Sequence, residues 1–190
     1  MMLETPRLRL HTWHERHRAP FAAMSADVDV MRDLGGPISR ADSDAKFARY
    51  AKAWDDDAIG RWAVEDRHGN FLGYAGIIFR REHPIGPHHD LGWRFVRDAW
   101  GNGYATEAAK AALHDGFTRI GMNETLAYTA PDNLRSQAVM ARLGLTRDSS
   151  RDFTADFGNG DWRGLMWVAR KRDKLGTSRQ ILVEAMRRGK

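Results

Sequence analysis

The chain has 190 residues, of which 42% are hydrophobic and 29% are charged, and its formal net charge is +5. This length fits one domain, and no apolar run approaches the roughly 18 residues of a membrane span, so we expect a cytoplasmic protein without a membrane partner. The chain lacks cysteine, which excludes disulfides, cysteine-ligated zinc and an acyl-cysteine intermediate. Basic and acidic residues are mixed except near the C-terminus, which argues against nucleic acid as a partner. The positive net charge also suits a ligand with several phosphates.

The first half of the chain alternates between strand-like and helix-like periods. The predicted elements are a strand at 3–11, one or two short helices at 20–33, a long helix at 39–56, and a hairpin of strands at 61–66 and 71–80. Ser39 and Asp42 resemble a capping box and mark the start of the long helix. Gly73 and Gly76 weaken the second hairpin strand and predict a bend or bulge there.

Two groups of histidines raise the question of a metal site: His11, His14 and His17, and the set of His83, His88 and His89 with Asp90. In the first group the change from strand to helix argues against a shared face, so we expect exposed histidines. The second group falls in a predicted loop at 82–89 and lacks a cysteine partner or helical pairing. A loop that faces the substrate is therefore favoured there, and no metal site is predicted.

The stretch at 90–107 is the most informative part of the sequence. A buried strand at 91–96 leads into Gly101-Asn102-Gly103, and an amphipathic helix follows from Ala105 to about residue 120. Glycines let backbone N–H groups approach a ligand, and the start of a helix favours an anion, so this segment suits phosphate or pyrophosphate. The alternative is a strand–helix corner whose glycines only turn the chain. The segment is not a P-loop, and it lacks the third glycine of a dinucleotide fingerprint.

A second strand–helix unit follows the first. The remaining predicted elements are a strand at 126–129, a helix from Leu134 that ends at Gly144, closing strands at 146–153 and 165–170 around a loop at 157–160, and a short basic helix beyond 171. Ala130-Pro131-Asp132-Asn133 separates the strand from the helix of this unit. The final segment could pack on the domain, join a homodimer or remain partly disordered.

These motifs together resemble a known family. WGNGYA at 100–105, followed by PDNLRSxxVMxxLGL at 131–145, is similar to the acetyl-CoA site of the GCN5-related N-acetyltransferases, the GNAT superfamily. The ribosomal-protein N-terminal acetyltransferase-like branch, often called RimJ/RimL-like, is the closest. ETPRLRL at 4–10 and VMRDLGGP at 30–37 extend the likeness over most of residues 3–170.

The resemblance implies an α/β (α+β) fold, with a mixed, mostly antiparallel central sheet whose fourth and fifth strands are splayed and flanked by helices. It implies one acetyltransferase domain at 1–170, with 171–190 as a basic extension. Acetyl-CoA is the implied cosubstrate. Its pantetheine arm would pair with the main chain of Arg94, Phe95 and Val96 and bond to Asn133. Its pyrophosphate would be enclosed by Gly101, Asn102, Gly103, Tyr104, Ala105 and Thr106.

The implied reaction is direct attack on the acetyl-CoA carbonyl by a primary amine, either a protein N-terminus or a small molecule. Asp90 is the candidate general base, although it could instead hold a loop or bind a cationic acceptor. A backbone N–H near Phe95 or Val96 would polarise the carbonyl. Many members place a tyrosine where this chain has Met140, so water or the Ser136 hydroxyl would protonate the thiolate, with Tyr128 as the next candidate.

Two other functions stay open at this point. The chain could be a non-catalytic acyl-CoA-binding or sensing protein, or it could acetylate a small-molecule amine or antibiotic on the same scaffold. We expect segments 20–40, 82–90 and 153–162 to determine the acceptor.

Overall fold

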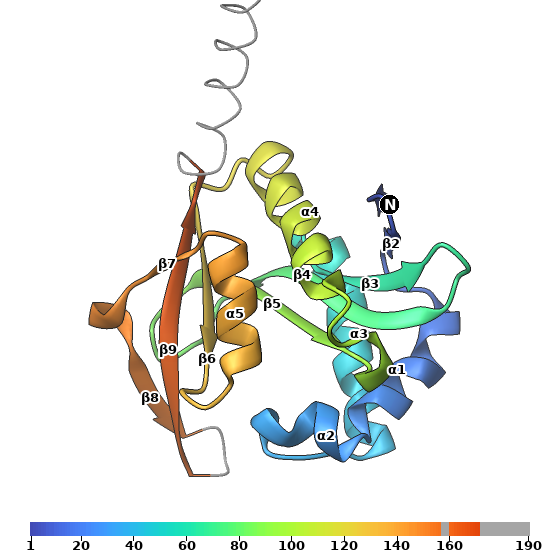
Figure 1. The fold of residues 1–190 in the computed structure, drawn as a ribbon, viewed down its shortest axis with the longest axis horizontal. Coiled ribbons are helices and arrows are strands. Elements are labelled where there is room, and N and C mark those ends of the chain that lie inside the picture. Colours follow the sequence, from blue (N-terminus) through green and yellow to red (C-terminus); the bar gives the residue numbers. More distant parts are fainter. Residues whose placement is uncertain (157–159, 172–190) are drawn as a thin grey trace, which may run out of the picture.

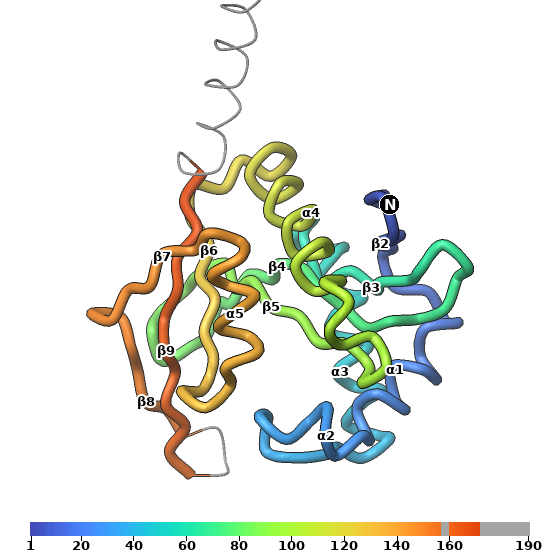
Figure 2. The backbone as a smooth tube through the Cα atoms, in the orientation of Figure 1, coloured from blue at the N-terminus to red at the C-terminus, as the bar shows by residue number. Residues whose placement is uncertain are grey.

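The computed structural model describes residues 1–156 and 160–171 (Figures 1 and 2). Within them the strands are β1 (Met2–Glu4), β2 (Leu8–His11), β3 (Arg61–Asp66), β4 (Phe71–Arg80), β5 (His88–Phe95), β6 (Glu124–Thr129), β7 (Thr146–Arg147), β8 (Phe153–Asp156) and β9 (Asp161–Arg170). The helices are α1 (Arg18–Ser25), α2 (Val28–Met31), α3 (Arg40–Asp57), α4 (Tyr104–Thr118) and α5 (Leu134–Arg142). Short 3₁₀ turns follow at Glu15–His17, Arg32–Leu34, Arg97–Ala99 and Ser149–Arg151.

The strands form one open sheet in the order β1-β2-β3-β4-β5-β6-β9-β7, and β8 pairs with β9. Every described pair is antiparallel except β5 and β6, which are parallel and share a single register pair, Asp90 with Leu126. Beyond that pair the two strands diverge (Figure 1). The expected mixed, mostly antiparallel sheet with a splayed pair is therefore confirmed.

The splayed strands are fifth and sixth here because the predicted first strand is two strands. Residues 3–11 were expected to be continuous, but β1 and β2 form an antiparallel pair in which Met2 lies opposite His11. Pro6 lies in the turn between them, where its missing N–H and fixed φ favour a change of direction.

Helices cover both faces of the sheet. Alternation along β3 decides which residues meet which helices: Trp62 and Val64 pack with α4, whereas Ala63 joins the aromatic cluster of α1 and α3. Helix α5 packs beside α4, where Val139 and Met140 join the same hydrophobic cluster as the end of α4 (Figure 1). The two helices therefore stand side by side over the opening between β5 and β6.

Several local predictions are confirmed. The Ser39 hydroxyl accepts the N–H of Asp42 at 3.1 Å and caps α3. In the hairpin, Val64 pairs with Gly73 and Glu65 with Phe71, which leaves one extra residue on β4 and makes the expected bulge. A Cβ on Gly73 would lie only 2.1 Å from the Arg94 carbonyl oxygen, so the bulge requires glycine.

The closing strands differ from the prediction. Residues 146–153 do not form one strand, because a 3₁₀ turn separates β7 from β8. The Asp152 carboxylate stabilises this break: it accepts the Met166 N–H at 2.9 Å and binds Arg147 at 2.5 Å. Strand β9 begins at Asp161, earlier than expected. Residues 157–159 of the predicted loop, and the predicted basic helix beyond 171, lie outside the described residues.

Both histidine groups are also corrected. His88 and His89 lie in β5 rather than in a loop, because pairing with β4 extends back to Arg80 opposite His88. His17 was expected to be exposed but is buried, and its Nε2 lies 2.8 Å from Glu65 Oε1, while Nδ1 accepts the His14 N–H at 3.1 Å. Burial lowers the pKa of His17 despite Glu65, so this imidazole is neutral.

His11 is half-buried, and its Nε2 lies 3.2 Å from Glu65 Oε2. The turn after β2 brings the rings of His11, His14 and His17 within 5.6 to 6.2 Å of one another, closer together than the change from strand to helix suggested. Across residues 1–156 and 160–171, no group of three or more His, Asp or Glu side chains is arranged to hold a metal ion. The same residues contain no helix both long and apolar enough to cross a membrane.

Candidate active site

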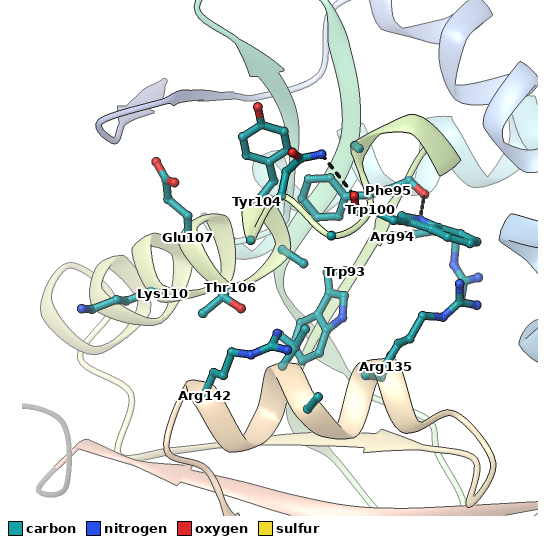
Figure 3. Close-up of a pocket in the computed structure, with 18 of the residues that line it drawn as sticks. Trp93, Arg94, Phe95, Trp100, Tyr104, Thr106, Glu107, Lys110, Arg135 and Arg142 are labelled. Atoms are coloured by element: carbon teal, nitrogen blue, oxygen red, sulfur yellow. Dashed lines mark hydrogen bonds between the residues drawn. The ribbon is translucent and has the colours of Figure 1, made fainter.

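A cleft of about 1430 Å³ lies between α4 and α5, beside the free edge of β5 (Figure 3). We call it the α4–α5 cleft. The predicted cofactor residues on its wall are Arg94, Phe95, Gly101, Asn102, Gly103, Tyr104, Ala105, Thr106 and Asn133, and Ser136 joins them. Val96 and Asp90 are not among its lining residues. Two segments far apart in sequence, 93–107 and 133–142, thus meet at one cavity.

The main chain of β5 faces two directions in turn. The Val96 N–H donates to the Leu72 carbonyl of β4 at 2.9 Å, so it is engaged within the sheet, contrary to the prediction for this residue. Because hydrogen-bonded and non-bonded pairs alternate in antiparallel strands, Arg94 also faces β4 and Phe95 faces the cleft. The Phe95 carbonyl accepts the Trp100 indole N–H at 2.9 Å. By this alternation the Phe95 N–H is a main-chain donor of β5 that faces the cleft.

The glycine loop has the backbone that an anion site needs. Gly101 and Gly103 both have φ of 78°, a left-handed conformation that favours glycine. Gly103 is the N-cap of α4. The N–H groups of Tyr104, Ala105 and Thr106 lie in the first turn, where the helix offers no carbonyl four residues back to accept them. The Thr106 hydroxyl is buried and has no hydrogen-bond partner among the described residues. An unpaired donor beside these N–H groups fits an anionic ligand such as a pyrophosphate.

The loop is held by hydrogen bonds to Arg7 and within the loop itself. Arg7 Nη1 donates to the Asn102 carbonyl at 2.9 Å, and Asn102 Nδ2 donates to the Trp100 carbonyl at 3.1 Å. Arg7 also pairs with Glu107 at 2.7 Å, and both residues are among those that line the cleft. The one carboxylate in the first turn of α4 is thus paired with a cation at the wall of the cleft.

The cleft is also lined by cations that were not predicted from the sequence. Lys110, Arg135 and Arg142 are on its wall, and none of the three has an ion pair with a described residue (Figure 3). The Arg135 guanidinium lies 3.9 Å above the Trp100 ring. Arg135 and Arg142 are seven residues apart on α5, a spacing that places them on one face and could have revealed them. Trp93, on β5 between the two helices, was also missed.

A second cavity, of about 780 Å³, lies beneath α3 on the other side of β5. We call it the α3 cavity. All three segments expected to determine the acceptor contribute to it, through Asp33, Glu82 and Trp162 among others. The residues that line both cavities are Asp33, Trp93, Arg94 and Ser136. The two cavities therefore meet at the splay of the sheet.

A hydrogen-bond network links the residues at this junction. Arg94 Nη1 donates to Asp33 Oδ1 at 2.9 Å and to the Val30 carbonyl, and Asn133 Nδ2 donates to Asp33 Oδ2 at 2.5 Å. Burial raises the pKa of Asp33, but Arg94 outweighs it and holds the pKa below its usual value. Asn133 Oδ1 accepts the Ser136 N–H at 3.1 Å and caps α5. Both ends of the Asn133 amide are engaged within the protein.

Asp90 lines the α3 cavity and is 4% exposed. Its Oδ2 accepts from Arg61 Nη2 and from Arg80 Nε, each at 3.0 Å. Burial raises the pKa of Asp90, but the charges of Arg61 and Arg80 outweigh it, so the pKa is lowered. A carboxylate stabilised by two guanidinium groups is a weak proton acceptor, which argues against Asp90 as general base.

Gly92 makes room for the Arg61 guanidinium, and Gly76 supplies it with an acceptor. A Cβ on Gly92 would lie 2.7 Å from Arg61 Nη2, and the Gly76 carbonyl accepts from Arg61 Nη1. The Asp90 carbonyl accepts from the same nitrogen at 2.9 Å. Gly76 and Gly92 lie opposite each other on β4 and β5, so the Arg61 guanidinium lies over a gap in the sheet surface. Gly76 itself is required by the close approach of the neighbouring backbone, because a Cβ there would lie 2.4 Å from the Gly60 carbonyl oxygen.

Comparison with known proteins agrees with this geometry. Residues 7–146 match the model of the acetyltransferase (GNAT) domain. The uncharacterized N-acetyltransferase YnaD of Bacillus subtilis is 33% identical over 163 residues, which cover 85% of this chain and 92% of the relative.

Solved structures share the fold at lower identity. The ribosomal L7/L12 α-N-protein acetyltransferase RimL, in complex with coenzyme A, superposes with a TM-score of 0.71 at 14% identity and covers 90% of this chain and 98% of its own. Spermidine N-acetyltransferase from Vibrio cholerae, in complex with CoA and spermine, has a TM-score of 0.72 at 18% identity and covers 90% and 99%. At these identities the likeness shows the fold alone.

Proposed function

The chain belongs to the GNAT family of acetyl-CoA-dependent acyltransferases, and from that premise we propose that it acetylates a primary amine by direct attack within a ternary complex. The observation that carries the proposal is the meeting of the two cavities at Asp33, Trp93, Arg94 and Ser136. A thioester held in the α4–α5 cleft and an amine held in the α3 cavity would come together there. As part of the proposal we assign the chain to the RimJ/RimL-like branch, on the motifs at 4–10 and 100–105.

The proposed roles follow from the contacts described above. The N–H groups of the first turn of α4, the Thr106 hydroxyl, Arg135 and Arg142 would bind the phosphates, because unpaired donors and cations favour an anion. The Phe95 N–H would stabilise the oxyanion that forms as the amine attacks. Ser136 lines both cavities, so its hydroxyl would donate to the departing sulfur. A chain without cysteine cannot form an acyl-cysteine, which favours direct attack.

The charges of the α3 cavity bear on the acceptor. Lys46 and Arg49 line this cavity from α3, and neither has an ion pair with a described residue. Asp42 and Glu82 line the same cavity and have no ion pair with a described residue either, so its charges do not by themselves select the acceptor. We favour a peptide N-terminus on the RimJ/RimL-like motifs at 4–10 and 100–105.

Release of CoA thiol tests this proposal. The purified chain is mixed with acetyl-CoA and one acceptor at a time: a peptide with an N-terminal serine, the same peptide with a blocked N-terminus, spermidine, or an aminoglycoside. We expect release with the free peptide, none with the blocked one, and less with spermidine. Calorimetric binding of acetyl-CoA without thiol release for any acceptor would favour the sensing function instead.

A further inference from the structure

We propose that Tyr74 is the general base that takes a proton from the incoming amine, an inference that rests on the acetyl transfer proposed above. Because Asp90 is a weak proton acceptor, the general base must be another group in the α3 cavity, close to the junction of that cavity with the α4–α5 cleft. Tyr74 lies on β4, directly opposite Arg94 on β5, and lines the α3 cavity. Arg94 lines both cavities. Tyr74 is therefore one strand away from the junction, and its side chain is 5% exposed.

The charged groups around the Tyr74 phenol come from four elements. Lys46 Nζ of α3 lies 5.9 Å from the ring centroid. The positive charges of Arg94 on β5 and Arg61 on β3 also favour the phenolate. The Asp33 carboxylate, the nearby negative charge, is bound to Arg94. The Tyr50 ring, also from α3, lies 5.3 Å away. Burial alone would raise the pKa of Tyr74, but the charges of Lys46, Arg94 and Arg61 outweigh it and lower the pKa to about 8. A phenol with that pKa is partly ionised near neutral pH.

The other two tyrosines on the cavity wall behave in the opposite way. Burial raises the pKa of Tyr50, and burial together with the Asp90 charge raises the pKa of Tyr128, so both stay protonated. Groups in one cavity whose pKa values are driven apart are the natural acid and base. Tyr74 is thus the phenol suited to accept a proton, and its pKa near the working pH suits it better than the strongly ionised Asp90.

The proton balance is as follows. The amine enters as an ammonium and gives one proton to the Tyr74 phenolate, which later returns it to solvent. The nitrogen lone pair then forms the C–N bond to the acetyl carbonyl. When the C–S bond breaks, the second amine proton ends on the CoA sulfur. The products are the amide, CoA thiol and one released proton, with no further reactant.

The first test measures ionisation without any acceptor. The chain has four tyrosines, so tyrosinate ultraviolet absorbance can be followed against pH for each phenylalanine variant. In the parent protein we expect one phenol to titrate near pH 8. Tyr74→Phe removes that step, whereas Tyr50→Phe and Lys46→Gln move it to higher pH, because each removes a group that favours the phenolate. If all phenols of the parent titrate at about 10 or above, the proposal is overturned.

The second test measures kcat against pH with the N-terminal serine peptide. In the parent, kcat rises with pH and levels off above the pKa of Tyr74. Tyr74→Phe should lower kcat by about 10² and remove the rise, with acetyl-CoA affinity unchanged. The matched Tyr50→Phe should keep the rise but shift it upward. If the parent transfers acetyl but Tyr74→Phe keeps its rate and pH profile, Tyr74 is not the base and the proposed function stands. If the parent acetylates none of the acceptors, the proposed function itself fails.

Discussion

The α4–α5 cleft and the α3 cavity use charge in different ways. In the α4–α5 cleft, the groups that would meet a ligand are backbone N–H groups and cations without ion pairs, such as Arg135 and Arg142. In the α3 cavity most charges are bound to each other, as in the Arg61–Asp90 and Arg94–Asp33 pairs. The α4–α5 cleft is thus ready to bind an anion. In the α3 cavity the paired charges are fixed in place, so its chemistry depends on the few charged and titratable groups without an ion pair.

The largest effect should come from the wall of the α3 cavity. Asp90→Asn leaves the Arg61 guanidinium buried without its counter-charge, and breaking a buried pair in this way costs about 3–5 kcal/mol. Denaturant unfolding measures the loss. If Asp90 were instead a general base, the variant would keep its stability and lose only rate. Lys52, paired with Asp56 on the exposed face of α3, offers the control: Asp56→Asn should cost less than about 1 kcal/mol.

The pH dependence of stability gives an independent measure of the same pair. The folded pKa of Asp90 lies below the ordinary 3.8, so its contribution is fully present above that pH and is lost as pH falls through the folded pKa. Between pH 7 and 5, Asp90→Asn should therefore differ from the parent by a constant amount. The difference should shrink only in stronger acid. A difference that already narrows at pH 5 would show a raised pKa and contradict the ion-pair account.

The next largest effect should come from the glycine loop. Gly103→Val puts a branched side chain at a φ of 78° and beside the first-turn N–H groups, so acetyl-CoA affinity should fall by at least about tenfold. Calorimetry measures this. Gly69→Val is a matched control, because Gly69 has a φ of 85° in the β3–β4 turn, outside both cavities. The control should lose similar stability and keep its affinity; equal loss of affinity in both would remove the loop from the site.

The junction of the two cavities can be tested with two neighbouring substitutions on α5. Ser136→Ala should lower kcat by about tenfold, through the lost hydrogen bond to the sulfur. Met140→Leu keeps the volume of a buried side chain that has no proton to donate, and it should retain most activity. Steady-state kinetics at saturating acetyl-CoA compares them. A silent Ser136→Ala would assign the proton to solvent or to Tyr128.

The smallest effect should come from the exposed cations of the α4–α5 cleft. Arg142→Ala should weaken acetyl-CoA binding by a few-fold at low salt, and the difference should fade as salt screens the charge. Arg163→Ala removes an exposed arginine of β9 outside the cleft and should change nothing. Equal effects of both variants would show that net charge alone, rather than the position of Arg142, controls binding.

The same contrast explains what the sequence could predict. The glycine loop, the start of α4 and the Ser39 cap depend on neighbouring residues, so local patterns were enough to find them. The α3 cavity depends on pairs that are distant in the chain: Arg61 and Asp90 are 29 residues apart, and Asn133 and Asp33 are 100 apart. The sequence could suggest Asp90 as a base but could not show the arginines that fix its charge, because only the folded sheet brings them together.

The direction of the Val96 N–H could not be predicted from the sequence for a related reason. Whether an N–H faces β4 or the cleft depends on the register of β4 against β5, and the bulge near Gly73 affects that region. The splayed pair itself could be expected from the family resemblance, since the two strand–helix units at 91–120 and 126–143 carry the motifs. The exact donors that line the opening could not.

The most direct test of the central claim, that thioester and amine meet at the junction of two cavities, is an initial-rate study in which acetyl-CoA and the N-terminal serine peptide are both varied. Direct attack in a ternary complex predicts double-reciprocal lines that intersect, and no acetyl adduct on the protein after incubation with acetyl-CoA alone. Parallel lines, together with a protein-bound acetyl group, would show a covalent intermediate and contradict the account.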